Sequence, residues 1–305
     1  MPSTPSEGAA MAAGERRAMA SGQLRRRASE NRPGRTPPRP GRRSDLGARI
    51  IVAAPALALA GLVVWRGGAI FAALLIVLGW ICLDELYRMT SRSSPARLAG
   101  FAALLALIAA AYWGDRDQVL LVAIAALPVT FLVTLASPRG SAYGIAVTML
   151  GVWWIGLAMA HAVMLRALPH GGGIITDVLV GTFVGDTGAY LGGRSFGRRR
   201  LAPSVSPNKT VEGLIIGMVC AVAGVWFASL YQGWLPKGDA LLLGVGVAVA
   251  APIGDLFESY LKRRSGVKDS GRVFGAHGGA LDRLDAALFA VVTGYYVWLA
   301  ILGSR

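Results

Sequence analysis

Residues 259–285 read SYLKRRSGVKDSGRVFGAHGGALDRLD, and a long apolar stretch flanks them on each side. Lys, Arg and Asp side chains, one His and five Gly are gathered here, although only 16% of the whole chain is charged. Charge at a membrane boundary is costly to desolvate, so a dense cluster of both signs indicates a functional site. Carboxylates can hold a divalent metal, and Lys and Arg can bind phosphates. The segment therefore predicts a phosphate-binding site at the rim of a membrane.

The rest of the chain has the composition of a membrane protein, with 54% hydrophobic residues and a mean hydropathy of +0.52. A helix of about 20 apolar residues crosses about 30 Å of hydrocarbon. We predict an all-α polytopic membrane protein with an active site on the cytoplasmic side. It has about nine transmembrane helices, near 48–65, 68–87, 97–113, 118–136, 143–162, 174–191, 212–231, 240–258 and 284–302.

The basic residues divide unevenly between the two sides of such a topology. With a cytoplasmic N-terminus, 26 of the 31 Lys and Arg residues fall in the inner segments. Because cytoplasmic loops carry an excess of Lys and Arg, we expect the N-terminus and the loops 192–211 and 259–285 in the cytoplasm. Arg outnumbers Lys, and Ala and Gly are frequent, which is typical of a GC-rich bacterial gene. The predicted location is a bacterial plasma membrane.

Residues 1–47 are rich in Pro, Gly, Ser and Arg and have no periodic apolar face. Such a segment cannot bury enough surface to fold, so we predict a disordered basic tail before a transmembrane domain, 48–305. Its arginines favour contact with anionic lipid headgroups. Nucleic-acid binding is the weaker alternative because no aromatic residue interleaves the arginines, and we expect no nucleic-acid partner.

The charged residues of the main cluster fall at helical spacings. Asp255, Ser259 and Lys262 share one helical face, and so do Asp282 and Asp285. Asp282 could serve only as a helix cap, since helix N-termini favour Asp. That alternative leaves Asp255 and Asp285 unexplained. Three carboxylates that converge from two helix ends favour a divalent-metal site, and Mg²⁺ typically combines one or two carboxylates with water and phosphates.

A second charged stretch, GGRSFGRRRLAPSVSPNKTVEG at 192–213, has a similar character. It follows a span that contains Asp186, and a lone intramembrane carboxylate favours a functional role. Thr210 offers cap chemistry, which would put Lys209 beside a helix N-terminus where anions bind. The arginines of this stretch are equally well explained as topology determinants.

Glycines recur at four-residue spacing in this part of the chain, at 181 and 185, 188 and 192, and 213 and 217. In spanning helices this spacing is typical of close helix packing.

The segment 259–285 resembles the signature of phosphatidate cytidylyltransferases, also called CDP-diacylglycerol synthases. The matching positions are Ser259, Lys262, Arg263, Lys268, Asp269, Gly271, His277, Gly278, Gly279, Asp282, Arg283 and Asp285. Ala280 departs from the pattern, where the family has a larger aliphatic residue, and the difference concerns packing. Residues 186–194 and 201–213 are similar to a second conserved region. The resemblance covers roughly 180–302, and the earlier spans resemble the family only as hydrophobic helices.

This resemblance implies an enzyme of phospholipid biosynthesis that joins CTP to phosphatidic acid and releases pyrophosphate. It implies Mg²⁺, with room for a second cation, held by Asp255, Asp282 and Asp285. The implied catalytic residues are Lys262, Lys268, His277 and Arg283. The implied substrate-binding residues are Asp186, Lys209, Ser259, Arg263, Gly278 and Gly279. Membrane lipids and a second copy of the chain are further candidate partners.

Two other classes of protein compete with this interpretation. A CTP-dependent polyprenol or lipid kinase would transfer the γ-phosphate to an alcohol and would need a base for the hydroxyl. A transporter or membrane scaffold is the other alternative. Transporter sites tend to lie near the bilayer midplane, whereas the charges here gather at the rim.

Overall fold

A computed structural model describes residues 61–271, 273 and 278–304. The chain divides into two compact units, Met1–Ala56 and Leu57–Arg305, and every described residue belongs to the second. The predicted tail, 1–47, lies outside the described residues, as does most of the first predicted span, 48–65.

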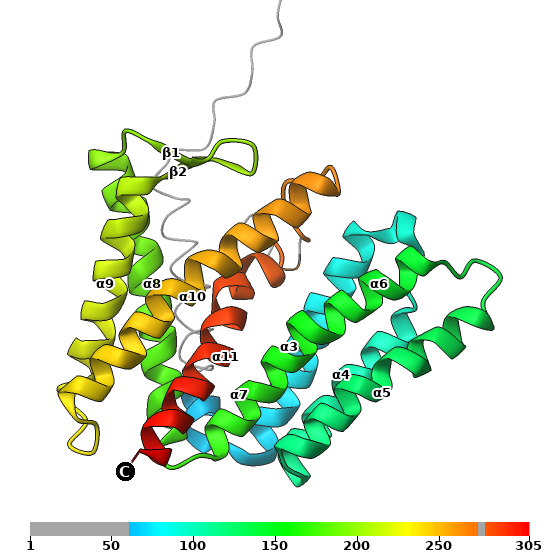
Figure 1. Ribbon diagram of the computed structural model, residues 1–305, viewed down its shortest axis with the longest axis horizontal. Helices are drawn as coiled ribbons and strands as arrows, with labels where there is room; N and C mark the ends of the chain where they lie inside the picture. Colours follow the sequence, from blue (N-terminus) through cyan, green and yellow to red (C-terminus); the bar gives the residue numbers. More distant parts are fainter. Residues whose placement is uncertain (1–60, 272, 274–277, 305) are drawn as a thin grey trace, which may run out of the picture. The chain divides into compact units, whose positions relative to one another are not determined.

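Helices account for most of the described part and strands for very little, which confirms the predicted all-α class (Figure 1). In chain order they are α3 (Gly68–Met89), the short η1 (Ser91–Ser93), α4 (Arg97–Trp113), α5 (Arg116–Leu135), α6 (Ala142–Gly151), the π-helical η2 (Val152–Gly156), α7 (Leu157–Ala167), α8 (Gly171–Phe196), α9 (Val211–Ser229), α10 (Lys237–Arg264) and α11 (Leu281–Gly303). Two short strands, β1 (Arg200–Ala202) and β2 (Ser206–Thr210), form an antiparallel hairpin between α8 and α9.

Seven helices among the described residues are long and apolar enough to cross a membrane, where α6, η2 and α7 count as one continuous span, Ala142–Ala167. Each of the seven matches a predicted span. The predicted span 97–113 coincides with α4, which is apolar but has only 17 residues. The protein is therefore a multi-pass membrane protein, and the total of nine spans stays a prediction.

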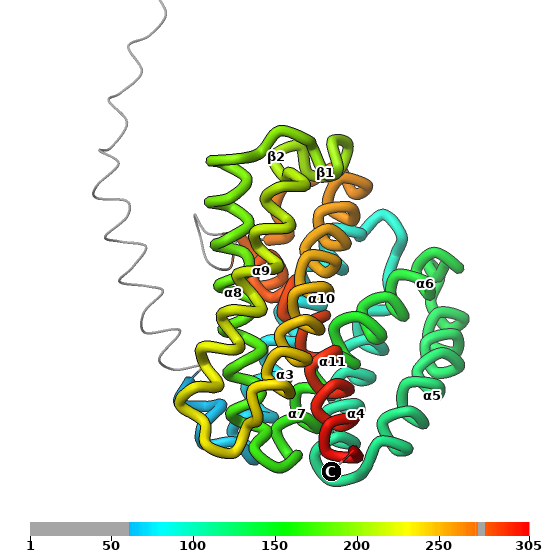
Figure 2. The backbone as a smooth tube through the Cα atoms, turned by 60° about the vertical axis from the view of Figure 1, so that its left-hand side comes forward, coloured from blue at the N-terminus to red at the C-terminus, as the bar shows by residue number. Residues whose placement is uncertain are grey.

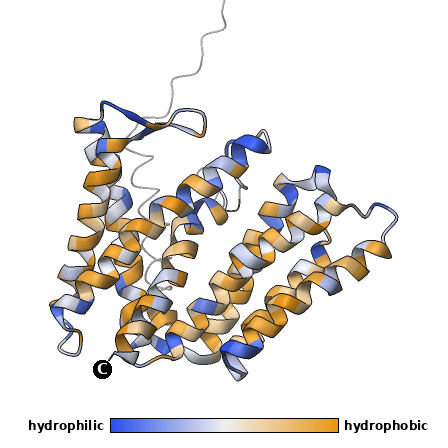
Figure 3. Cartoon of the chain, in the orientation of Figure 1, coloured by the Kyte–Doolittle hydropathy of each residue, from blue (hydrophilic) through white to orange (hydrophobic). Residues whose placement is uncertain are grey.

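Consecutive spans run in opposite directions, so alternate connections meet at the same end of the helices (Figure 1). The C-termini of α3, α5, α8 and α10 and the β-hairpin all lie at one end. The excess of Lys and Arg in these connections had predicted that they lie on the same side of the membrane. The same end is strongly hydrophilic at the hairpin and at the last turns of α10, whereas the helices between the two ends are mainly hydrophobic (Figure 3).

Helices α8 and α9 pack closely because glycines line their contact. A Cβ atom on Gly188 would collide with Cys220, and one on Gly217 would lie 2.7 Å from the Ala189 Cβ atom. The glycine spacing thus predicted the helix contact correctly. It places the middle of α8, which carries Asp186, against α9.

The β-hairpin is fixed by hydrogen bonds at the start of α9. The Thr210 hydroxyl accepts from the Gly213 N–H at 3.1 Å, which confirms Thr210 as the N-cap. The Glu212 carboxylate accepts from the N–H groups of Arg198, at 2.9 Å, and Arg199, at 3.1 Å. β2 contacts α8, α9 and α10, and both views place the hairpin beside the ends of these helices (Figures 1 and 2). The hairpin consequently holds Lys209 next to α10.

Candidate active site

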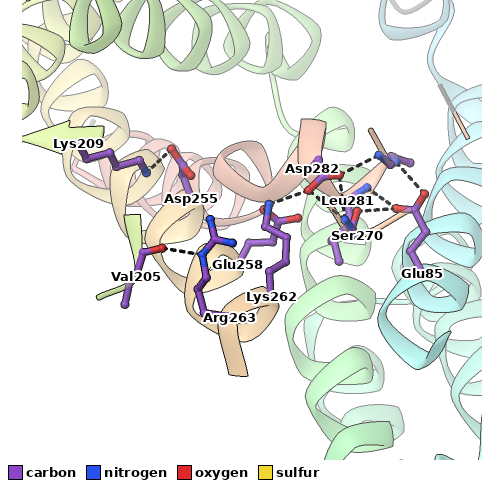
Figure 4. Close-up of polar contacts among 12 residues, drawn as sticks. Glu85, Val205, Lys209, Asp255, Glu258, Lys262, Arg263, Ser270, Leu281 and Asp282 are labelled. Carbon is purple, nitrogen blue, oxygen red and sulfur yellow. Dashed lines mark hydrogen bonds and ion pairs between the residues drawn. The ribbon is translucent and has the colours of Figure 1, made fainter. Parts of the chain in front are cut away.

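Helix α10 continues through Pro252 and ends at Arg264, six residues beyond the predicted span. Its last turns therefore carry Asp255, Glu258 and Lys262 on one helical face. The Nζ atom of Lys262 lies 2.5 Å from Glu258 Oε2 and 2.6 Å from Asp282 Oδ1 (Figure 4). The lysine thus joins the end of α10 to the beginning of α11, as the predicted convergence of two helix ends requires.

Asp282 does not act as the N-cap of α11. The cap position is Ala280, and Asp282 is the second residue of the helix. Its carboxylate accepts hydrogen bonds from the N–H groups of Gly279, at 2.8 Å, and Ser270, at 3.0 Å. The interpretation of Asp282 as a simple helix cap was therefore wrong. The side chain instead ties the segment between the two helices to the Lys262 ammonium group.

Asp255 belongs to a second ion pair, with Lys209 on β2 (Figure 4). Both side chains are about 30% exposed, at 28% for Lys209 and 31% for Asp255. The carboxylate of Asp186 interacts electrostatically with both of them. Three residues that the sequence selected from separate segments therefore come together, although Lys209 meets Asp255 rather than a free helix N-terminus.

These three residues line a cavity of about 710 Å³ between α8, α9, α10 and the hairpin. The part of the lining near the hairpin is strongly cationic, with Arg194, Arg198, Arg200 and Lys209. The part between the helices is made of small or apolar residues, among them Gly181, Gly217, Ala221, Ala248 and Ala251. The cavity thus combines a region suited to phosphates with a region suited to hydrocarbon.

The expected metal ligands do not form a compact triad. Within the described residues no three His, Cys, Asp or Glu side chains are grouped to hold a metal ion. Asp255 binds Lys209 and Asp282 binds Lys262, whereas Asp285 is buried, with 8% of its surface exposed. No described N–H or O–H group donates to Glu258 Oε1, although Asp282 and Asp285 lie close enough to interact with that carboxylate.

This donor set nevertheless fits Mg²⁺. The carboxylates of Asp255, Asp282, Asp285 and Glu258 offer the hard oxygen ligands that the ion prefers, and Mg²⁺ needs only one or two of them when substrate phosphates complete its shell. The buried Glu258 Oε1 atom, without a described donor, is an acceptor that a cation would satisfy.

The other selected residues lie around this cluster. Ser259 is half-buried on α10, and Lys268 and Arg283 are exposed on either side of the connecting segment. Arg263 points back to the hairpin, where its Nε–H donates to the Val205 carbonyl at 3.2 Å. The expected phosphate contact of Arg263 therefore competes with a structural one. His277 lies outside the described residues.

The glycines that precede α11 have conformational roles. Gly278 has φ +83°, a left-handed conformation that L side chains rarely adopt. The Gly279 N–H donates to Asp282, and a Cβ atom there would collide with the side chains of Ser270 and Glu85. Both positions shape the turn that delivers Asp282, whereas their expected contact with substrate stays a prediction.

Two glutamates of this cluster were missed in the sequence. Glu258 is fully buried one turn before Lys262, and Glu85 is 3% exposed near the end of α3. The rule that singled out Asp186, a carboxylate within an apolar span, applies equally to both of them. Glu258 falls at the predicted boundary of its span, where a charged residue is expected. The sequence of α3 contains no motif that indicates a function for its charged residues.

The fold and the site define a multi-pass membrane protein with lysines and carboxylates beside an amphipathic cavity. Residues 47–301 match the model of the cytidylyltransferase family. The chain belongs to this family.

Two staphylococcal relatives match this chain over most of their length, and a third relative matches over about half of its length. The phosphatidate cytidylyltransferase of Staphylococcus saprophyticus is 30% identical over 240 residues, which cover 75% of this chain and 90% of the relative. The enzyme of the same name from Staphylococcus aureus is 32% identical over 234 residues, or 74% and 88% of the two chains. That of Haemophilus influenzae is 38% identical over 138 residues, or 44% and 48%.

Proposed function

We propose that this protein is a phosphatidate cytidylyltransferase, which transfers CMP from CTP to phosphatidic acid and releases pyrophosphate. One observation carries the proposal beyond the family match. Two lysine–carboxylate pairs, Lys209 with Asp255 and Lys262 with Glu258 and Asp282, lie at the hydrophilic end of the same helix, and the first of them lines the amphipathic cavity.

The reaction needs charge neutralisation more than acid–base chemistry. An oxygen of the phosphatidate phosphate attacks the α-phosphorus of CTP, a new P–O bond forms, and the bond to the β-phosphate oxygen breaks. The nucleophile is already an anion, so no strong base is required. The difficulty is that two polyanions must meet in line while charge develops on the leaving pyrophosphate. Positioning and electrostatic stabilisation can supply most of the catalysis.

The cavity suits an amphipathic lipid beside a nucleotide. Its arginines and Lys209 can bind phosphate groups near the hairpin, since Arg and Lys both pair with phosphate oxygens. The apolar part between α8, α9 and α10 can accept the start of the acyl chains. A lipid bound in this way would have its phosphate beside Asp186, Lys209 and Asp255.

The two lysines bind carboxylates in this structure, and we infer that substrate changes their partners. Phosphates would draw Lys209 away from Asp255 and Lys262 away from Asp282, which would leave Asp255, Asp282 and Asp285 to hold Mg²⁺. When bound, Mg²⁺ neutralises the phosphates of CTP and stabilises the leaving group. Glu258 keeps the Lys262 ammonium group in place, because it lies one helical turn before it and is fully buried.

We also place the site on the cytoplasmic face of a bacterial plasma membrane, where CTP is available, with membrane lipids around the helices. The support is the excess of Lys and Arg in the connections at the site's end. Association with a second copy of the chain stays a prediction.

Labelled CTP tests the reaction directly. The purified protein is incubated with phosphatidate, Mg²⁺ and CTP that carries ³²P at either the α or the γ position. We expect α-label in the lipid and γ-label in pyrophosphate. Incorporation of γ-label into lipid would instead identify a CTP-dependent lipid kinase, and no incorporation of either would reject both activities.

A further inference from the structure

Glu85 is a buried carboxylate on α3. It is far in sequence from the segment that joins α10 to α11 but contacts that segment directly. Its Oε1 atom accepts from the Ala280 N–H at 3.0 Å, and its Oε2 atom accepts from the Leu281 N–H at 2.9 Å. Oε2 also accepts from the Ser270 hydroxyl at 3.0 Å. Figure 4 shows the side chain reaching from α3 across to these groups.

These bonds give α11 an N-terminal cap from another helix. Ala280 occupies the cap position and has no side chain that could accept a hydrogen bond. The first N–H groups of a helix have no partner within it, and leaving them buried without an acceptor is costly. Glu85 satisfies two of these groups, and its negative charge lies at the positive end of the helix dipole.

Two glycines allow the backbone to lie directly against the Glu85 carboxyl group. A Cβ atom on Gly271 or on Gly279 would collide with the Glu85 carboxyl group. The side chain is therefore enclosed by the residues that follow Ser270 and by those that begin α11. It joins α3 to the two flanks of the segment between α10 and α11.

The backbone that Glu85 fixes also orients the side chains of the candidate active site. Ser270 and Gly279 donate their N–H groups to Asp282, which in turn binds Lys262. Asp285 lies one turn further along α11. A small displacement of the helix start would move both aspartates, and reaction rates are sensitive to shifts of about 1 Å.

We propose that Glu85 is a positioning residue for cytidylyl transfer, which fixes the start of α11 and thereby the placement of Asp282 and Asp285. The proposal rests on the proposed function. Glu85 acts through the backbone of α11 and does not touch substrate. Its loss should therefore lower kcat and leave the KM values for CTP and phosphatidate nearly unchanged.

The primary variant is Glu85→Gln. An amide has one acceptor oxygen where the carboxylate has two, so either orientation leaves the N–H of Ala280 or of Leu281 facing an amide NH₂ group. We expect kcat to fall at least about tenfold, as for loss of hydrogen bonds to a charged group, with KM changed less than about threefold. Asp84→Asn is the matched control, because that neighbouring carboxylate pairs with Arg88 and Arg97 instead.

A second measurement does not depend on activity. A nitroxide label at Val273→Cys, an exposed position, reports by its spectral line shape how firmly the segment is held. Cys220→Ser removes the accessible native thiol, and Cys82 is fully buried. We expect greater label mobility with Glu85→Gln and wild-type mobility with Asp84→Asn. This readout would report on Glu85 even if the protein catalysed another reaction.

Ser270→Ala provides a milder variant in case Glu85→Gln does not fold. It removes one of the three bonds that described residues make to Glu85, so kcat should fall about two- to fivefold and the label should gain some mobility. The double variant should lose less than the product of the two single losses, because both act on one contact. Wild-type kcat in Glu85→Gln, unchanged mobility in both variants, or equal losses in Asp84→Asn would overturn the proposal.

Discussion

The Nζ atom of Lys262 lies 2.6 Å from Asp282 Oδ1, so one ammonium group links the last turn of α10 to the first turn of α11. The same group lies 2.5 Å from Glu258 Oε2, and the side chains of all three residues are at most 13% exposed. The cation between these two carboxylates offsets the repulsion between them. The lysine is consequently as important for stability as for the reaction.

Lys262→Met should therefore destabilise the protein as well as inactivate it. Removing one partner of a buried charge pair costs about 3–5 kcal/mol, because the remaining charges lose their compensation. The thermal unfolding temperature in detergent should drop by several degrees. Arg264→Ala is the control, since this exposed arginine lies over the Tyr260 ring and has no ion pair with a described residue. Equal unfolding temperatures for both variants would contradict the expectation.

Asp282→Asn and Asp285→Asn test the proposed Mg²⁺ ligands. An amide of the same shape removes one negative charge, so Mg²⁺ should bind far more weakly. Losing its stabilisation of the leaving group should lower the rate by about three orders of magnitude. The measurement is pyrophosphate release at rising Mg²⁺ concentration. Asp269→Asn, at an exposed position, serves for comparison. Near wild-type rates for both variants would end the hypothesis.

Gly217→Ala should weaken the contact between α8 and α9. The new methyl group would lie 2.7 Å from the Ala189 Cβ atom and 2.8 Å from the Gly185 carbonyl oxygen. Overpacking of this kind typically costs about 1–3 kcal/mol. Gly238→Ala has no atom within 4 Å of the added group and should leave the unfolding temperature unchanged. The measurement is the unfolding temperature of each variant, and equal values for the two would contradict the prediction.

The proposed topology can be checked by cysteine labelling. Arg264, at the end of α10, and Ser304, after α11, are both exposed and lie at opposite ends of the helices. A membrane-impermeant maleimide applied to intact cells should modify Ser304→Cys and spare Arg264→Cys until the membrane is opened. Labelling of both in intact cells would refute the proposed orientation of the site.

Deletion of residues 2–44 should leave turnover in detergent nearly unchanged. The residues proposed to bind substrate or metal lie between Asp186 and Asp285, the positioning residue Glu85 lies on α3, and the tail holds none of them. Binding to vesicles that contain anionic lipid should weaken, because ten arginines are lost. A hundredfold loss of activity in a folded protein would show that the tail belongs to the site.

The helices and part of the site could be read from local patterns. Apolar length predicted the spans, and the spacing of Asp255 to Lys262 and of Asp282 to Asp285 predicted two shared faces. Both signals lie within about one or two turns of a single helix, where geometry follows from the sequence alone. The glycine spacing in α8 and α9 worked for the same reason, since it encodes the shape of a helix surface.

The partners of these residues could not be read in this way. Lys209 and Asp255 are on different elements, and Glu85 precedes Ser270 by 185 residues. Which charge meets which depends on how whole helices pack, and no local period records that. Asp282 illustrates the consequence: its place at a helix start was predicted correctly, but the N–H groups that it binds belong to Gly279 and Ser270.

The glycines on the facing surfaces of α8 and α9 also have a consequence for how the sequence can vary. Gly181, Gly185 and Gly217 allow the helices to touch, and the same three residues line the cavity. A larger side chain at any of them would force the helices apart or occupy space that the substrate needs. A substitution at these positions would therefore harm both folding and catalysis. A compensating change elsewhere would have to restore the contact between the helices and the space in the cavity.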